Sequence, residues 1–215
     1  MNNYYYHFLT YHTGGQYRKA AKRLIKSAKS FGIQIDVLQI KDQGGWHHNV
    51  NRKAEVIYQW YKKNKKPFVI LDADCVIHQE PVLFKERLSD LSHLYCKDKH
   101  WFISTGVCAF DCNPVITSLL EMWARNSIQK RLSKEPIKKW KSDYALKNAY
   151  KSISKFKTID KTILPRVYGK PYWLNWGIKT KDIVISCNER CTLYEDGLYK
   201  QEKRKRKDNL HVESI

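Results

Sequence analysis

The sequence contains no long apolar run and no recognisable leader. In its 215 residues, no apolar stretch approaches the roughly 18–20 residues that a membrane-spanning helix needs. The opening residues, MNNYYYHFLTYH, lack the basic segment followed by an apolar core that marks a secretory signal. Hydrophobic residues still make up 42%, enough for a folded core. We therefore expect a cytoplasmic protein (in the host cytoplasm if it is phage-encoded) without a transmembrane segment.

Acidic residues are scarce. Only 21 Asp and Glu stand against 40 Lys and Arg, so the formal net charge is +19. The segment KQEKRKRKDNLHVESI (200–215) has six basic and three acidic residues, net +3, which leaves +16 for residues 1–199. A charge spread in this way favours a polyanionic partner such as nucleic acid, an anionic membrane or an acidic glycan, although lysine is also an ordinary solvated surface residue. We expect residues 1–199 to form one domain and 200–215 to be a mobile basic tail.

The six cysteines do not indicate a disulfide framework. Without a secretory signal they are expected to be reduced thiols. The segments CAFDC and CNERC (108–112 and 187–191) share a spacing that zinc sites use. Cys108 ends an apolar run typical of a strand, in which residues i and i+4 lie about 13 Å apart. We therefore favour buried thiols over a structural zinc site.

Hydrophobic patterning predicts alternating strands and helices without an internal repeat or a dividing linker. Expected strands span 4–13, 33–40, 67–77, 101–111 and 181–187, and expected helices span 16–32, 51–66, 114–128 and 142–153. Strand–helix alternation in the first half of the chain favours parallel pairing, with helices on both faces of an open α/β sheet.

Two carboxylates end the most apolar strand, in the stretch VILDADCV. In open α/β sheets, ligands bind beyond the carboxyl ends of the strands, where Asp72 and Asp74 stand. On a regular strand, residues i and i+2 point the same way. Two carboxylates together with phosphate oxygens suit Mg²⁺ or Mn²⁺. The alternative is an Asx-type turn or helix cap at the strand end.

Four segments in order resemble one enzyme family. The stretch VILDADCVIHQEPVLF is similar to the Asp-x-Asp (DxD) region of nucleotide-sugar glycosyltransferases with the GT-A fold. The segments GWHHNVNRKAEVIYQW, STGVCAF and KSDYALKNAY resemble that family's preceding helix, donor-sugar strand and acid-bearing helix start. The resemblance covers roughly residues 4–190. It implies a single GT-A-like, Rossmann-like α/β domain (1–199), with a mostly parallel central sheet flanked by helices.

The resemblance also implies a donor site. A hexosyl- or pentosyltransferase of this family takes a nucleoside-diphosphate sugar, most often a UDP-sugar, with Mn²⁺ or Mg²⁺ held by Asp72 and Asp74. Asp74 is the expected catalytic ligand, because a metal there stabilises the departing diphosphate. Arg52 and Lys53 are candidates to neutralise phosphate, or else are helix surface charge. Gly106 would line the donor sugar.

Other expected site residues come from further along the chain. At the end of the first strand, Thr10 and Tyr11 are placed to bond or stack with the nucleoside, although Tyr11 suits a core position as well. Asp143 is the second catalytic candidate, as a general base or a ligand of sugar hydroxyls, unless it is a helix N-cap. Where relatives carry a third metal ligand, usually His, this chain has Cys187, which leaves three alternatives: His211 completes the site, water completes it, or metal dependence is weak.

The acceptor is predicted from charge and from resemblance to small phage enzymes that glycosylate hydroxymethylated pyrimidines. Scattered Lys and Arg would bind DNA phosphates, Trp46, Trp173 and Trp176 could stack on bases, and a target base would have to flip out. A surface glycan or a lipid-linked acceptor is the alternative. Two alternatives belong to other classes of protein: a haloacid-dehalogenase-like phosphatase with Asp72 as nucleophile and Asp74 as general acid, or a DNA-binding protein without catalytic activity.

Overall fold

The computed structural model describes residues 3–43, 46–96, 102–132, 142–171 and 178–187. Its elements are β1 (His7–His12), α1 (Gly15–Lys29), β2 (Ile35–Gln39), α2 (Trp46–Val50), α3 (Lys53–Asn64), β3 (Phe68–Leu71), β4 (Val76–Ile77), the 3₁₀ turn η1 (Val82–Lys85), β5 (Leu91–Cys96), β6 (Phe102–Phe110), α4 (Pro114–Leu132), α5 (Ser142–Ile153), β7 (Lys161–Ile163), the 3₁₀ turn η3 (Arg166–Tyr168), β8 (Lys170–Pro171), the 3₁₀ turn η4 (Thr180–Asp182) and β9 (Ile185–Cys187). Among these, no helix is both long enough and apolar enough to cross a membrane.

A six-stranded sheet in the order β2-β1-β3-β6-β5-β7 forms the centre of the structure. The pairings β1–β2, β1–β3 and β5–β7 are parallel, whereas β6 runs antiparallel to both β3 and β5. Five strands therefore share one direction and β6 opposes them. The predicted mixed α/β fold with a mostly parallel sheet is confirmed, and the reversal of β6 is a feature that the sequence pattern did not indicate.

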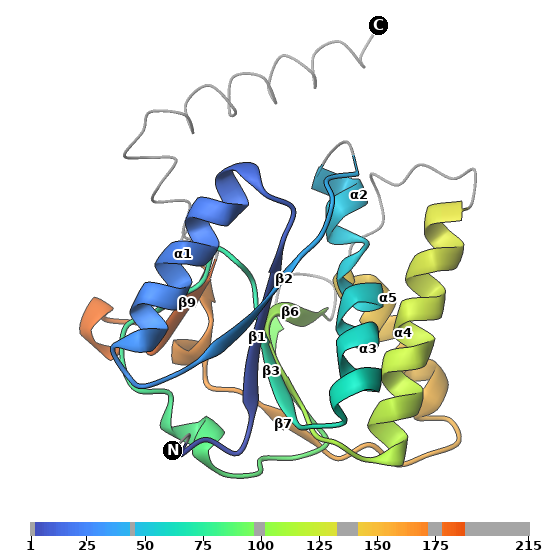
Figure 1. Ribbon diagram of the computed structural model, residues 1–215. Helices are drawn as coiled ribbons and strands as arrows, with labels where there is room; N and C mark the ends of the chain where they lie inside the picture. Colours follow the sequence, from blue (N-terminus) through green and yellow to red (C-terminus); the bar gives the residue numbers. More distant parts are fainter. Residues whose placement is uncertain (1–2, 44–45, 97–101, 133–141, 172–177, 188–215) are drawn as a thin grey trace, which may run out of the picture.

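Helices cover both faces of this sheet, as Figure 1 shows: α1 lies on one side and α3, α4 and α5 on the other. On the sheet face that α3, α4 and α5 cover, the core includes the buried residues Leu9, Phe68, Phe110 and Trp123. The α1 face also carries a small second sheet in the order β4-β9-β8. All four residues of β3 are buried because β3 lies in the middle of the main sheet, which explains its unbroken apolar sequence.

The predicted strand 67–77 is wrong as a single element. The chain leaves the main sheet after Leu71, turns through residues 72–75, and re-enters as β4 of the second sheet, paired with β9. Asp72 and Asp74 therefore lie in a turn and not on a regular strand, so the alternation of a strand does not place their carboxylates on one side. Strands β5 and β7 and the short helix α2 were not predicted, while helix 142–153 matches α5.

Two local features shape the sheet edge at the ends of β1 and β3. Gly14 and Gly15 have positive φ values of 94° and 54°, so the chain reverses tightly between β1 and α1 where a side chain would be strained. In the pairing of β5 with β6, the register jumps from His93 opposite Cys108 to Leu94 opposite Ser104. Residues 105–107 are therefore extra, and such a bulge re-aims nearby side chains.

Candidate functional site

The acid pair lies in the turn that follows β3, at the edge of the sheet toward which β1 also runs. The Asp72 amide donates to the Gly106 carbonyl at 2.8 Å, and the Cys75 amide donates to the Asp72 carbonyl at 2.9 Å. These bonds fix the turn against β6. The Asp72 side chain is 29% exposed, so its carboxylate remains open to a ligand.

Lys53 reaches Asp72 from α3. It lies on the buried stripe of the helix with Ile57, Trp60 and Tyr61, spaced i, i+4, i+7 and i+8, so its side chain turns toward the sheet. Its ammonium donates to a carboxylate oxygen of Asp72 and to both the carbonyl and the hydroxyl of Thr105, each at 3.2 Å. An ammonium has three hydrogens, and three acceptors surround this one.

The electrostatics of this contact favour a charged Lys53. Burial by itself would lower the pKa of Lys53, since its side chain is only 4% exposed. The Asp72 carboxylate, together with smaller contributions from Tyr11 and Asp143, outweighs that effect, and the pKa of Lys53 lies above its ordinary value. The ammonium therefore keeps its charge, and Asp72 has a permanent cationic partner.

Thr105 links this ion pair to Asp143. A carboxylate oxygen of Asp143 accepts from the Thr105 amide at 2.8 Å and from its hydroxyl at 2.5 Å. Asp143 is in the first turn of α5, and the adjacent Ser142 carbonyl accepts from the indole of Trp123 at 3.1 Å, which anchors the start of that helix. The chain Asp72–Lys53–Thr105–Asp143 connects residues from four separate segments in one hydrogen-bonded series.

Gly106 leaves space in front of Asp72. A Cβ atom at this position would lie 3.4 Å from an oxygen of Asp72, 3.5 Å from the Ser104 hydroxyl and 3.7 Å from the Cys187 sulfur. Cys187 is therefore close to the acid pair, as predicted from its place in the sequence. Its sulfur is buried and lies 3.5 Å from that of Cys75, where it accepts the Cys75 S–H hydrogen bond.

Tyr11 and Thr10 face opposite sides of β1. The Tyr11 ring centroid lies 5.9 Å from the Lys53 ammonium nitrogen, and Tyr11 is half-buried beside the site. Burial raises the pKa of Tyr11; Lys53 opposes this and Asp72 reinforces it. Thr10 points to the face that α1 covers, is fully buried, and has a hydroxyl without a hydrogen-bond partner among the described residues. Its predicted contact with a nucleoside stays a prediction, and its surroundings are those of a core residue.

Other predicted residues lie elsewhere. The Arg52 guanidinium contacts Glu55 at 3.2 Å, and both line a groove of about 1030 Å³ between β2 and helices α3 and α4. The structure therefore does not bring Arg52 to the acid pair. His211, Trp173 and Trp176 are outside the described residues, as is the segment 200–215.

The turn after β3 carries two carboxylates, those of Asp72 and Asp74. Within the described part of the chain, no group of three or more His, Cys, Asp or Glu side chains could hold a metal ion; Cys191 of the zinc spacing noted above lies outside it. Cys75, Cys108 and Cys187 are buried free thiols, as predicted. Among the described residues, a cation at Asp72 and Asp74 would have these two carboxylates, with further coordination from diphosphate and water, which matches the preference of Mg²⁺ for few protein ligands.

Of the comparisons with known proteins, the one with solved structures finds a similar fold. No protein-family model matches the chain, and no curated protein matches it in sequence. Among solved structures, it resembles the crystal structure of a glycosyltransferase involved in glycosylation of the major capsid of PBCV-1. The TM-score is 0.59 at 14% identity, over 84% of this chain and 92% of the other.

The match identifies the fold of the chain. The six-stranded, mostly parallel sheet with helices on both faces is a GT-A-like fold, and the chain spans nearly the whole of the matched glycosyltransferase. At 14% identity, that likeness establishes the fold, and the activity is argued separately from the site.

Proposed function

We propose that the protein is a metal-dependent glycosyltransferase that moves a sugar from a nucleoside-diphosphate sugar, of which UDP-sugars are the first choice, to a hydroxyl acceptor. The observation that carries this proposal is the series Asp72–Lys53–Thr105–Asp143 at one edge of a GT-A-like sheet. It joins the acid expected on the diphosphate side to the acid expected on the sugar side. A phosphatase of the haloacid-dehalogenase type is disfavoured, because two strands, β1 and β2, precede the acid pair.

Asp72 and Asp74 would hold Mn²⁺ or Mg²⁺. Lys53 occupies one oxygen of Asp72, while the other faces the space left by Gly106, so the donor set suits a cation that completes its shell with diphosphate and water. When bound, the cation would stabilise the charge of the leaving diphosphate. His211 as a further ligand remains a proposal from the sequence.

Lys53 is proposed here as a positioning residue. Its three acceptors are protein groups, so it orients Asp72 and does not need a phosphate as partner. Asp143 is proposed on the sugar side. One of its oxygens is held by Thr105 and the other can accept from hydroxyl groups of the sugar or the acceptor, so the contact to substrate would have a fixed orientation.

The proposed acceptor is a hydroxymethylated base in DNA, which the charge of +16 over residues 1–199 supports. The second candidate is a surface glycan or a lipid-linked acceptor. It is favoured by the matched structure, whose protein takes part in glycosylation of a viral capsid.

A donor panel tests the proposal. Donor hydrolysis and transfer to plain or hydroxymethylated duplex DNA would be followed by mass of the product nucleosides, with Mn²⁺, with EDTA and with the D74A variant. We expect glycosylated nucleosides only with hydroxymethylated DNA and Mn²⁺, and a loss of at least about 100-fold in D74A, the range of one removed electrostatic stabiliser. No donor turnover with any sugar nucleotide, together with phosphate release from small phosphoesters, would replace the proposal by the phosphatase.

A further inference from the structure

Helix α1 carries only one sign of charge. Its fifteen residues, GQYRKAAKRLIKSAK, contain six Lys or Arg and no Asp or Glu. By contrast, α3 contains Glu55 and α4 contains Glu121 among their basic residues. A helix without acids cannot neutralise its own charge through i, i+4 pairs, so its positive field extends into solvent.

Four of these cations share one face. At about 100° per residue, Arg18, Lys22, Lys26 and Lys29 fall within an arc of about 80°. All four are exposed, and we call this set the α1 basic face. The opposite face packs on the sheet through the buried residues Ala20, Ala21, Leu24 and Ala28. The orientation of the cations is therefore set by the core and not by the lysines themselves.

The α1 basic face is a straight row of charge. Its ends, Arg18 and Lys29, are eleven residues apart, which is about 16 Å along a helix axis. Among the residues that the structure describes, none of the four cations has an acidic partner within an ion-pair distance. The row thus offers charge to an external polyanion.

We propose that the α1 basic face binds the phosphate backbone of duplex DNA. The inference rests on the proposed function only in that this DNA would be the acceptor. DNA carries one negative charge per about 1.7 Å of its axis, a dense match for a row of cations. An interfacial membrane helix would expose large apolar side chains beside its cations. On the outer side of α1, Ile25, 36% exposed, is the one large apolar residue, so the face favours DNA over a lipid surface.

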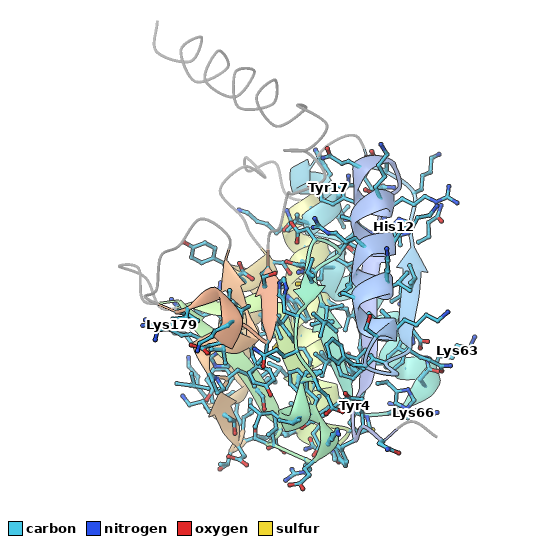
Figure 2. All side chains as sticks on the ribbon, turned by 90° about the vertical axis from the view of Figure 1, so that its left-hand side faces the viewer. Tyr4, His12, Tyr17, Lys63, Lys66 and Lys179 are labelled. Carbon is cyan, nitrogen blue, oxygen red and sulfur yellow. The ribbon has the colours of Figure 1, made fainter. Side chains whose placement is uncertain are left out.

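The position of α1 suits an acceptor contact. The helix begins at Gly15, directly after the Gly14–Gly15 reversal at the end of β1, so its first turn is a few residues from Tyr11. Figure 2 views the molecule from the side that α1 covers, with His12 and Tyr17 labelled in the upper part of that view. Because β1 and β3 are parallel, α1 begins at the same edge of the sheet as the turn that carries the acid pair.

The test compares two triple variants of equal charge. K22Q/K26Q/K29Q removes three cations of the α1 basic face, and K62Q/K63Q/K66Q removes three exposed lysines at the end of α3 as a matched control. Both lower the net charge from +19 to +16. Binding of a fluorescent 20-base-pair duplex would be measured by anisotropy between 50 and 200 mM salt.

For the α1 variant, we expect the salt slope, d log K/d log[salt], to fall in magnitude by about 2.7, at about 0.9 per lost phosphate contact, and the Kd to rise at least ~10-fold. The control should change the slope by less than about 1. Equal effects of the two variants would overturn the inference, because the binding would then reflect net charge alone. The inference would also be overturned if vesicles containing anionic phosphatidylserine bound the parent chain but not the α1 variant, while the parent chain and the α1 variant bound DNA equally well.

Donor hydrolysis without DNA separates this inference from the proposed function. A parent chain that binds DNA through α1 but hydrolyses no sugar nucleotide keeps the DNA surface and refutes the transferase. A parent chain that hydrolyses donor but shows no difference between the two triple variants in DNA binding keeps the transferase and refutes the DNA surface.

Discussion

Replacing Asp72 should destabilise the fold more than replacing its partner Lys53, although Asp72 is the more exposed of the two. Asp72→Asn leaves the Lys53 ammonium charged in a place where its side chain is 4% exposed, with only neutral acceptors around it. Lys53→Met removes the buried charge and keeps the length of the side chain. It leaves Asp72 29% exposed, where water can hydrate the carboxylate.

The magnitudes follow from these burials. Leaving a buried charge without its partner costs about 3–5 kcal/mol, and the partial exposure of the pair places D72N near the lower end, at about 3 kcal/mol. K53M leaves two Thr105 acceptors unbonded and should cost about 1–3 kcal/mol. The double variant has no unpaired charge, so its loss of unfolding free energy should resemble that of K53M. The coupling energy of the cycle is then about 2–3 kcal/mol.

Urea and thermal unfolding of the four proteins measure this cycle. For a domain of this size, about 3 kcal/mol lowers the Tm by about 6–12 °C. The control is E121Q, which breaks an exposed pair with Arg125 on α4 and should change stability by less than about 0.5 kcal/mol. Additive losses, with a coupling below about 0.5 kcal/mol, would refute the buried contact between Lys53 and Asp72.

Three further outcomes follow from the same site. Thr105→Val should lower kcat more than it raises KM, because it removes the hydroxyl hydrogen bond that holds Asp143. Thr105→Ser keeps the hydroxyl and should restore most of the lost rate. Steady-state kinetics of both variants test this, and equal rates for the Val and Ser variants would contradict it. The pKa of Lys53 is raised in the folded protein. The stabilisation of the fold by the charged Lys53 is therefore complete below about pH 10.4, the pKa in the unfolded chain, and is lost as the pH rises toward the pKa in the folded protein. Urea unfolding should therefore show a smaller stability difference between parent and K53M at pH 11 than at pH 8, and a constant difference would oppose the assignment. Gly106→Ala should keep donor binding, because a Cβ fits at 3.4 Å from Asp72, whereas Gly106→Val should weaken it at least ~10-fold, because two further methyl groups enter the space in front of Asp72. Calorimetric titration with UDP compares the two variants. Equal affinities would contradict the assignment of that space to the donor.

Regular elements with a strong local pattern could be predicted from the sequence. The four-residue strand β3 is apolar throughout because both its faces are buried, and α5 begins at Ser142 and ends at Ile153 as its periodicity indicates. The position of Asp72 and Asp74 directly after the apolar strand β3 could also be predicted, and it is the edge of the sheet where ligand sites of such folds gather. The burial of Lys53 also had a local signal, since Lys53 continues the buried stripe of Ile57 and Tyr61 while Arg52 lies off it.

The rest of the site depends on contacts between distant segments. Thr105 was missed because a Thr in an apolar strand is ordinary, and only the bulge opposite His93 and Leu94 turns it toward Lys53 and Asp143. The turn that separates β3 from β4 was missed for a similar reason. Val76 and Ile77 continue the apolar run in sequence, but they pair with β9, more than a hundred residues away.

The central claim is that a divalent cation binds beside the end of β3 together with a diphosphate. Mn²⁺ binding measured by electron paramagnetic resonance, with and without UDP, tests it most directly. The account predicts that UDP tightens Mn²⁺ binding in the parent chain and that D74N loses this effect while remaining folded by circular dichroism. Mn²⁺ binding that is indifferent to UDP, or equal in the parent and D74N, would contradict it.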